Sequence, residues 1–129
     1  MPHLLIEEIH ENHTDEFYSD KIDFLISEMR SRLHKPLTMT DLERLAGLSR
    51  RQLQIMFNKR FGFAPMEWQR RDRLRIARER LLNYRADISI SEVAEQVGFA
   101  SASRFSSYYK DIYGELPSET AGKSIKTDR

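Results

Sequence analysis

The sequence predicts an all-α protein made of two helix-turn-helix subdomains joined by a long linker helix. Three observations support this prediction. Apolar residues recur every three or four positions, and no alternating strand pattern of useful length is present. Serine or threonine is followed three residues later by Glu or Gln at several helix starts, which is the capping-box pattern. Finally, one helix–glycine–helix order occurs twice along the chain.

The repeat appears when residues 42–65, LERLAGLSRRQLQIMFNKRFGFAP, are set beside residues 93–117, VAEQVGFASASRFSSYYKDIYGELP. Gly47 corresponds to Gly98, and after this point the spacing between matching residues grows by one. The second unit therefore carries one inserted residue. The further matching pairs are Phe61 with Tyr113, Gly62 with Gly114 and Pro65 with Pro117.

The N-terminal residues 1–18 show weak periodicity and several acids, and we interpret them as a tail or the end of an interdomain linker. A first helix is expected from Ser19 and is ended by Pro36, since the residue before a proline avoids the helical region. Its apolar residues have helical spacing. They are Ile22, Leu25, Ile26, Met29 and Leu33.

The first helix-turn-helix subdomain is predicted over residues 19–64. Thr40-x-x-Glu43 has the capping-box pattern and predicts a short helix over Asp41–Ala46, which Gly47 ends in the left-handed conformation. Ser49-x-x-Gln52 predicts the start of a second helix of about a dozen residues. Its expected buried residues are Leu53, Met56 and Phe57, and Gly62 ends it.

The linker helix is predicted over residues 65–84, with Pro65 at its first position. One side is apolar, and Trp68 on that side is expected to be a core anchor. The apolar residues are Trp68, Leu74, Ala77, Leu81 and Tyr84. The arginines on its other faces are Arg70, Arg71, Arg73, Arg75, Arg78 and Arg80.

The second subdomain is predicted over residues 85–121. Ser89-x-x-Glu92 is a further capping box, and Gly98 is expected to end the helix that it starts. Gly114 ends the next helix and Pro117 begins a last short one, while residues 122–129 are predicted to be a frayed tail. The expected core residues are Val93, Ala94, Val97, Phe105, Tyr108 and Tyr109.

Charge is unevenly distributed along the chain. Residues 1–48 carry a net charge of −5, residues 49–85 carry +8, and residues 86–129 carry −2. A basic block between acidic flanks predicts a surface that attracts polyanions. The alternative is a solvated helix face on which arginines serve solubility, and composition alone favours neither interpretation.

Other classes of protein are disfavoured by composition. The chain contains no cysteine, which excludes disulfides and thiolate zinc sites. The acidic N-terminal sequence does not have the pattern of a secretory signal, and no apolar run is long enough to span a membrane. We expect a cytoplasmic protein that does not act at a membrane.

The motifs of the second unit give the chain a specific resemblance. Val93-Ala94-x-x-Val97-Gly98-Phe99 is followed by Phe105-x-x-Tyr108-Tyr109-Lys110-x-x-Tyr113-Gly114-x-x-Pro117, and the linker reads Arg73-Leu74-x-x-Ala77-x-x-x-Leu81. Over roughly residues 20–120 the sequence resembles the DNA-binding domain of the AraC/XylS family of bacterial transcription regulators. The resemblance implies about seven helices in two subdomains. It also implies that the second helix of each helix-turn-helix unit, here called the reading helix, enters a major groove, and that the two grooves are successive ones on one DNA face.

The chain departs from the family pattern at two places. The family commonly has an aromatic residue and an arginine at the positions of Thr120 and Ala121, which bears on the packing of the last helix. Glu43 stands where the family usually has alanine, which bears on the position of the first helix of the first unit, the helix that supports the reading helix.

The outward face of the first reading helix is predicted to read bases. With Leu53 and Phe57 placed inward, Arg51, Ile55 and Asn58 point outward, and Gln54 lies at the flank. Family contacts map onto Arg51, Gln54 and Ile55. We expect guanine, adenine and the thymine methyl group, respectively, as their partners. Incidental exposure or a protein partner is the alternative for Ile55.

The second reading helix is expected to present Ser103 and Ser107 outward, with Arg104 at its flank. Family contacts map onto these three residues. Because this face carries little charge, we expect it to read DNA shape and phosphate while the first unit discriminates bases. The candidate phosphate-binding residues of the whole chain are Ser49 (through its backbone amide), Arg50, Lys59, Arg70, Arg71, Arg73 and Lys110, and a solvated surface role is the alternative for the arginines.

The linker length agrees with reading two turns of DNA. A helix of about eighteen residues spans about 27 Å, and successive major grooves on one face lie about 34 Å apart. The predicted function is sequence-specific binding of double-stranded DNA by a transcription regulator. From the resemblance, activation by contact with RNA polymerase is expected, together with a separate sensing or dimerisation domain.

Other functions receive less support. A helical protein-interaction module with a basic face for an acidic partner is the main alternative. RNA binding would need an exposed stacking platform, which the pattern does not predict. His10 and His13 have a spacing suited to a metal, but an acidic tail explains them better, and we predict no metal and no cofactor. No catalytic constellation stands in a recognisable context, so we do not predict an enzyme.

Overall fold

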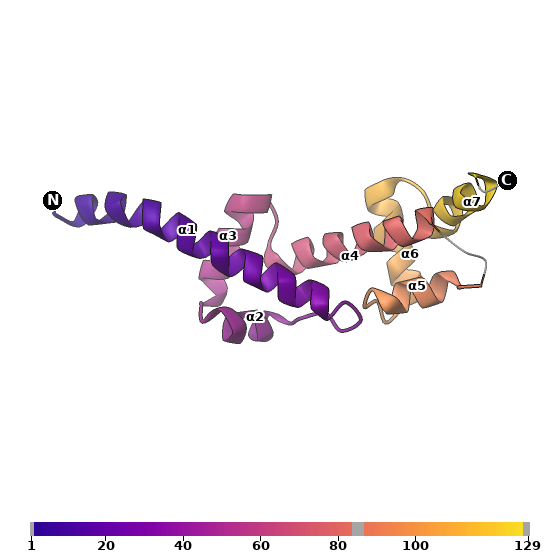
Figure 1. Cartoon of the computed structure of the whole chain (residues 1–129), viewed down its shortest axis with the longest axis horizontal. Helices are drawn as coiled ribbons and strands as arrows, with labels where there is room; N and C mark the ends of the chain where they lie inside the picture. Colours follow the sequence, from indigo (N-terminus) through magenta and orange to yellow (C-terminus); the bar gives the residue numbers. More distant parts are fainter. Residues whose placement is uncertain (1, 84–86, 128–129) are drawn as a thin grey trace. The chain divides into compact units, whose positions relative to one another are not determined.

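The computed structural model describes residues 2–83 and 87–127, with side chains for residues 16–83 and 87–123, and within these ranges it contains seven helices and no strand (Figure 1). The prediction of an all-α fold is confirmed. The helices are α1 Pro2–Ser31, α2 Met39–Ala46, α3 Arg50–Phe61, α4 Pro65–Leu82, α5 Ile90–Gln96, α6 Ala102–Tyr113 and α7 Pro117–Thr127. In this part of the chain, no helix is both long enough and apolar enough to cross a membrane.

The chain divides by its internal contacts into two compact units. The first unit consists of residues 1–31 and 37–66, and the second consists of residues 32–36 and 67–129. The structure thus groups nearly all of α4, which the sequence suggested as a separate linker, with the second unit. The subdomain boundaries drawn from the sequence stay a prediction.

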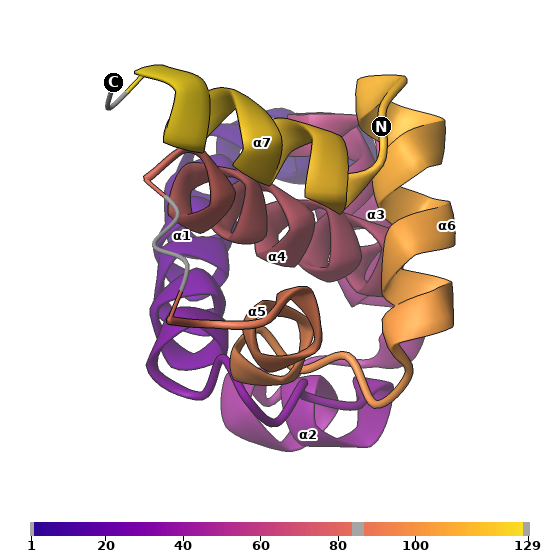
Figure 2. The ribbon, with the colours of Figure 1, turned by 90° about the vertical axis from the view of Figure 1, so that its right-hand side faces the viewer.

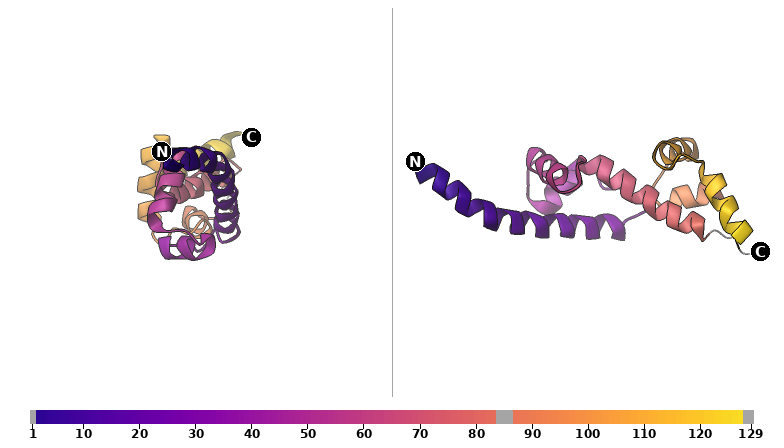
Figure 3. Two further views of the ribbon diagram at one scale, coloured as in Figure 1. Left: turned by 90° about the vertical axis from the view of Figure 1, so that its left-hand side faces the viewer. Right: turned by 90° about the horizontal axis from the view of Figure 1, so that it is seen from above.

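The first unit is built from α1, α2 and α3, which contact one another in all three pairs. Figure 3 shows α1 as one continuous long helix. Its residues Ile22, Leu25 and Met29 are buried, as the helical spacing predicts. The buried residues contributed by α2 and α3 are Leu42, Ala46, Leu53, Met56 and Phe57.

The start of α2 differs from the prediction. The N-cap is Thr38 and not Thr40: the Asp41 amide donates to Thr38 Oγ1 at 3.1 Å, and the Thr38 amide donates to Asp41 Oδ2 at 2.9 Å. Both threonines have an acid three residues later, so spacing alone does not choose between them. Leu37 decides the register, because it is buried immediately before the cap and pairs in pattern with the buried Leu42, as in a hydrophobic staple.

Two further predicted helix starts and three predicted glycine ends are confirmed, whereas α5 has Val97 as its C-cap in place of the expected Gly98, and α1 ends at Ser31, before Pro36. Ser49 with Gln52 and Ser89 with Glu92 form complete capping boxes. The glycines that end α2, α3 and α6 adopt the left-handed conformation. The structure also shows a cap that the sequence analysis did not identify, in which Ser101 accepts a hydrogen bond from the Arg104 amide.

The second unit places α5, α6 and α7 around α4 (Figure 2). Its core contains most of the residues predicted from the linker onward, together with Ala121 of α7, which was not predicted, and Phe105 and Tyr109 are its largest buried side chains. Trp68 and Tyr108, both expected in the core, are only half-buried. Tyr84 lies outside the described residues. The other core members are Leu74, Ala77, Leu81, Val93, Ala94, Val97 and Ala121.

The inserted residue of the second unit lies in the turn between α5 and α6. The N-cap Ser49 follows Gly47 by two positions, whereas Ser101 follows Gly98 by three. Both second helices keep the same length of 12 residues. The insertion therefore changes the turn and leaves the length of the reading helix unaltered.

Two terminal segments are more helical than the sequence suggested. The first helix begins at Pro2 and not near Ser19, and α7 continues to Thr127 where a tail was expected from Gly122. Weak amphipathic periodicity led to the shorter prediction. However, residues 3–18 contain neither proline nor glycine, and Pro2 suits a first helical position, so nothing local interrupts the helix.

Candidate nucleic-acid interface

The predicted base-reading residues of α3 lie together on its exposed face. Arg51, Gln54, Ile55 and Asn58 are all exposed, and they lie opposite the buried Leu53, Met56 and Phe57. Ile55 is 55% exposed, although isoleucine is usually buried. This face therefore offers a guanidinium group, two amides and an apolar contact without any rearrangement of the core.

The capping box at the start of α3 occupies groups that were expected to bind phosphate. The Ser49 amide donates to Gln52 Oε1 at 2.9 Å, and the Ser49 hydroxyl accepts from the Gln52 amide. The prediction that the Ser49 amide offers a free donor is therefore wrong, because the reciprocal cap uses it. The first-turn amides of Arg50 and Arg51 are the donors that a helix leaves free at this end.

The predicted contact residues of α6 are exposed as well. Ser103, Arg104, Ser107 and Lys110 all lie on the side opposite Phe105 and Tyr109. Besides Arg104 and Lys110, the exposed side of α6 carries the carboxylate of Asp111 and small hydroxyl groups.

Most arginines of the basic block are already engaged within the protein. Arg71 pairs with Glu67 at 3.2 Å, and Arg50 pairs with Glu43 at 3.2 Å. Arg75 pairs with two carboxylates, Asp72 at 3.0 Å and Glu79 at 2.7 Å. The net charge of +8 in this block is thus partly neutralised by neighbouring acids, and fewer of its cations are available to a ligand than composition suggests.

The exposed cations on the two reading helices contrast with these pairs. In residues 16–83 and 87–123, Arg51, Arg104 and Lys110 form no ion pair. Lys59, the remaining phosphate candidate of α3, is also exposed. The faces that the sequence assigns to DNA therefore carry three cations, Arg51, Arg104 and Lys110, that no carboxylate of the described chain neutralises.

Arg73 is a second phosphate candidate that the structure contradicts. It is only 3% exposed, and its guanidinium donates to the backbone carbonyls of Leu33 and Val97. A further bond from Nη2 reaches Gln69 Oε1 at 3.1 Å, whereas Nε has no partner among the described residues. Arg73 turns inward because the carbonyls just after α1 and at the end of α5 need donors.

Burial also changes the acidity of this arginine. Desolvation lowers the pKa of Arg73 to about 10, and the neighbouring Asp72 carboxylate opposes the shift. The guanidinium therefore keeps its charge at neutral pH. Gly98 fits closely against it, since a Cβ there would lie 2.6 Å from the Leu33 carbonyl oxygen and 2.7 Å from Arg73 Nη1. Gly98 also has φ = +89°, which favours glycine.

Arg70 is held in a different way. Its guanidinium carbon lies over the Tyr108 ring, 4.3 Å from the ring centroid, which is a cation–π contact. The Tyr108 ring in turn lies 6.3 Å from that of Phe99, and both rings pack against the core of the second unit. Arg70 is half-buried and forms no ion pair with a described residue.

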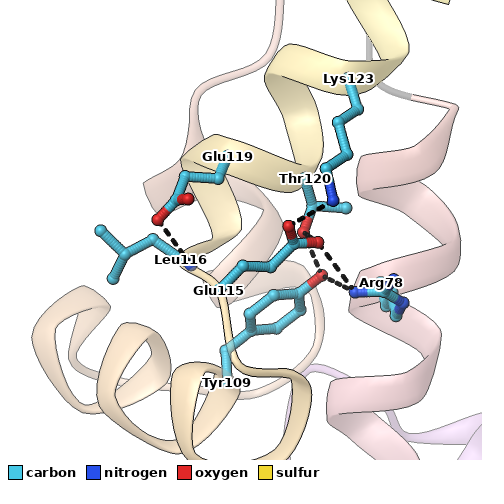
Figure 4. A network of polar contacts seen from close by, with 7 residues as sticks. All are labelled: Arg78, Tyr109, Glu115, Leu116, Glu119, Thr120 and Lys123. Atoms are coloured by element: carbon cyan, nitrogen blue, oxygen red, sulfur yellow. Dashed lines mark hydrogen bonds and ion pairs between the residues drawn. The ribbon is translucent and has the colours of Figure 1, made fainter.

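A polar network fixes α7 against α4 and α6, despite the departure from the family pattern (Figure 4). Thr120 is fully buried, and its hydroxyl donates to Glu115 Oε1 at 2.8 Å while the Tyr109 hydroxyl donates to it at 2.7 Å. Arg78 Nη1 donates to Tyr109 Oη at 3.2 Å and to Glu115 Oε1 at 3.3 Å. A small hydroxyl residue thus anchors the last helix where the family commonly has an aromatic residue.

Glu115 is the most strongly shifted acid in this network. Hydrogen bonds from Lys123 and Thr120 lower the pKa of Glu115 from 4.5 to about 2, against a smaller opposing effect of burial. The Lys123 bond is short, at 2.6 Å. This cluster is structural and contains none of the predicted DNA-binding residues.

Two histidines near the N-terminus, His10 and His13, have a spacing suited to metal ligation, and their side chains lie outside the described residues. In the part of the chain with described side chains, no group of three or more His, Asp or Glu residues is arranged to hold a metal ion.

Comparisons with known proteins agree with this arrangement. A family described as a helix-turn-helix domain matches residues 42–123. The chain is 35% identical over 97 residues to the XylDLEGF operon transcriptional activator 2 of Pseudomonas putida, covering 74% of this chain and 62% of the relative. It is 34% identical over 100 residues to the transcriptional regulator GlxA of Rhizobium meliloti, covering 78% of this chain and 30% of that one.

A solved structure shows the same fold. An AraC-type transcriptional regulator from Chromobacterium violaceum matches with a TM-score of 0.75 at 29% identity, covering 82% of this chain and 93% of that one. The matched relatives are longer proteins, of which this chain spans less than two thirds. Since relatives of this kind are regulators, the expectation that the chain is not an enzyme is confirmed. The chain belongs to the AraC/XylS family of transcription regulators and carries the two helix-turn-helix units of its DNA-binding domain.

Proposed function

We propose that the chain binds double-stranded DNA sequence-specifically, with α3 and α6 each entering a major groove, and that it regulates bacterial transcription as an activator. The observation that carries this proposal is the distribution of cations. Most arginines away from the reading faces are paired or buried, whereas Arg51, Arg104 and Lys110 are exposed and unpaired in the described chain. An α-helix fits the major groove, where base edges present distinct donors and acceptors.

The two reading faces differ in chemistry, so we assign them different roles. The α3 face combines Arg51, Gln54, Ile55 and Asn58, which suit guanine, adenine and thymine contacts. The α6 face presents Ser103, Arg104 and Ser107, which suit phosphate contacts and weaker base preference. The first unit then supplies most of the sequence discrimination, and the second supplies affinity.

Selection of bound sequences from a random duplex pool tests this proposal. Two preferred blocks about one helical turn apart are expected if both helices read DNA. Log affinity should fall linearly with log salt, with a slope of about −0.9 per phosphate neutralised. A failure to bind any duplex at low salt would instead favour a helical protein-interaction module with an acidic partner.

Alanine substitutions distinguish the two faces. Arg51→Ala should cost about 1–3 kcal/mol against the selected site and relax the preference at one base position. Arg104→Ala should weaken binding to all duplexes more evenly, because its partner is expected to be phosphate. The comparison uses selection with each variant, and an equal loss of sequence preference in both would reject the division of roles.

The matched relatives include transcriptional activators, which supports activation as the direction of regulation. We further propose that the chain contacts RNA polymerase at the promoter and works with a separate sensing or dimerisation domain. Its location is then the cytoplasm, where bacterial DNA is found. A reporter gene placed behind the selected site tests the direction, since repression would lower expression where activation raises it.

A further inference from the structure

The stacked pair of Arg70 and Tyr108 has a feature that its neighbours on α4 do not share. Arg71 and Arg75 are each paired with a carboxylate of their own helix. Arg70 is paired with no carboxylate of the described chain, and its guanidinium lies over the Tyr108 ring at 4.3 Å. Its charge is therefore held in place without being neutralised.

Stacking leaves the hydrogen-bonding edge of a guanidinium available. The planar group contacts the aromatic ring with its face, while its N–H donors point outward in the plane. The Tyr108 ring is itself fixed, because it is half-buried and packs near Phe99 against the second-unit core. Arg70 is thus restricted in conformation before any ligand binds, which lowers the entropic cost of forming a bidentate contact.

The pair lies beside the reading face of α6. Tyr108 follows Ser107 directly and is one helical turn after Arg104, so Arg104 and Tyr108 share one flank of the helix. The one carboxylate that shares this flank on α6 is that of the exposed Asp111. Two cations, Arg104 and the stacked Arg70, therefore border the face that we assign to the groove.

We propose that Arg70 binds a backbone phosphate at the edge of the groove entered by α6, and that Tyr108 is the positioning residue that holds it there. This inference rests on the proposed function and names a residue that the reading-helix pattern does not include. The ligand is a phosphodiester of duplex DNA, so the contact adds affinity without base preference.

Substitutions at both positions test the proposal in the full chain. Arg70→Gln should weaken duplex binding about tenfold at low salt and reduce the salt slope by about 0.9. Tyr108→Leu removes the ring and should weaken binding about two- to fivefold, whereas Tyr108→Phe keeps the ring and should bind as the parent does. The probes are the selected duplex and an unrelated duplex of equal length, and the losses should be similar on both.

The double variant separates positioning from a purely structural role. If Tyr108 acts through Arg70, Tyr108→Leu should cause no further loss of affinity in the Arg70→Gln background. Thermal unfolding of each variant identifies any loss caused by misfolding. Arg75→Gln is the matched control, because Arg75 lies on the same helix and is paired with Asp72 and Glu79. It should leave the salt slope unchanged.

The results also separate this inference from the proposed function. An unaltered salt slope in Arg70→Gln, or an equal effect of Tyr108→Leu with and without Arg70, would overturn the inference while duplex binding by the parent still stands. A parent chain that binds neither duplex at low salt would overturn both.

Discussion

At the scale of single residues, the fold decides which arginines remain available to a polyanion. Carboxylates engage Arg50, Arg71 and Arg75, and backbone carbonyls engage Arg73. Arg51 and Arg104 keep their charge exposed on the reading helices. Exposed ion pairs contribute little to stability, so most of the paired arginines are expected to tolerate substitution, and Arg73 is the exception.

Arg73→Ala should lower the free energy of unfolding by about 1–3 kcal/mol, because the Leu33 and Val97 carbonyls would lose their donor inside the protein. Urea unfolding followed by circular dichroism measures this change. Arg71→Ala, which removes an ion pair with Glu67 on the same helix whose two side chains are both about 40% exposed, is the control and should change stability by less than about 1 kcal/mol. Equal losses in the two variants would contradict the role given to Arg73.

Ile55 gives a prediction about a single methyl group. If its exposed side chain packs on the thymine methyl group, replacing that thymine by uracil in the selected site should weaken the binding free energy by about 0.8 kcal/mol, which is the typical contribution of one buried methylene group. Ile55→Ala should remove this discrimination, whereas Ile55→Val should keep most of it. Titrations of each variant with thymine and uracil duplexes measure the difference, and an unchanged thymine preference in Ile55→Ala would rule out the contact.

At the scale of helices, caps and glycines set where each element begins and ends. The three helices α2, α3 and α5 begin with reciprocal capping boxes, and α2, α3 and α6 end at a left-handed glycine. These devices act within one turn, so they fix the two helix-turn-helix corners independently of the rest of the fold. The reading helices therefore start at defined residues, which fixes the side chains that they present.

The start of α2 can be tested directly with two neighbouring threonines. Thr38→Ala removes the N-cap hydroxyl and should destabilise the protein by about 1 kcal/mol. Thr40→Ala, two residues later inside the helix, should change stability by less than about 0.5 kcal/mol, because its hydroxyl does not cap the helix. Thermal or urea unfolding measures the stability of both variants. A larger loss of stability in Thr40→Ala than in Thr38→Ala would restore Thr40 as the cap.

At the scale of the whole molecule, charge is organised into separate roles. Arg51, Arg104 and Lys110 on the reading faces pair with no carboxylate of the described chain, while Glu115 in the second unit serves structure, at the centre of the network that fixes α7. Salt is therefore expected to weaken DNA binding strongly. Acid should affect folding through Glu115, since its partners stabilise the carboxylate form.

The acid dependence has a definite sign. The folded pKa of Glu115, about 2, lies below its ordinary value of 4.5, so its carboxylate contributes stability above pH 4.5. That contribution should be lost progressively as pH falls from 4.5 to 2. Glu115→Gln should flatten the decline of unfolding free energy across this window, whereas Glu95→Gln on the exposed face of α5 should not. Identical pH profiles for parent and Glu115→Gln would contradict the assignment.

Features that depend on local physics could be predicted from the amino-acid sequence. Helical periodicity predicted most of the buried residues of α3 and α6, and therefore the exposed positions Arg51, Ile55 and Ser107 opposite them. Left-handed glycines and most caps were predictable because their signals lie within one helical turn. The repeated helix–glycine–helix unit indicated the all-α class, because both copies carry the same short-range signals.

Roles that depend on residues far apart in the chain were set by three-dimensional packing. Arg73 reaches the Leu33 carbonyl across 40 positions and the Val97 carbonyl across 24, so no local pattern distinguishes it from the exposed arginines beside it. Burial of Leu37 chose Thr38 over Thr40 as the cap, and Thr120 became an anchor through Tyr109 and Glu115. The physical reason is that hydrogen bonding and burial are satisfied in three dimensions, by whichever groups the packed helices bring together.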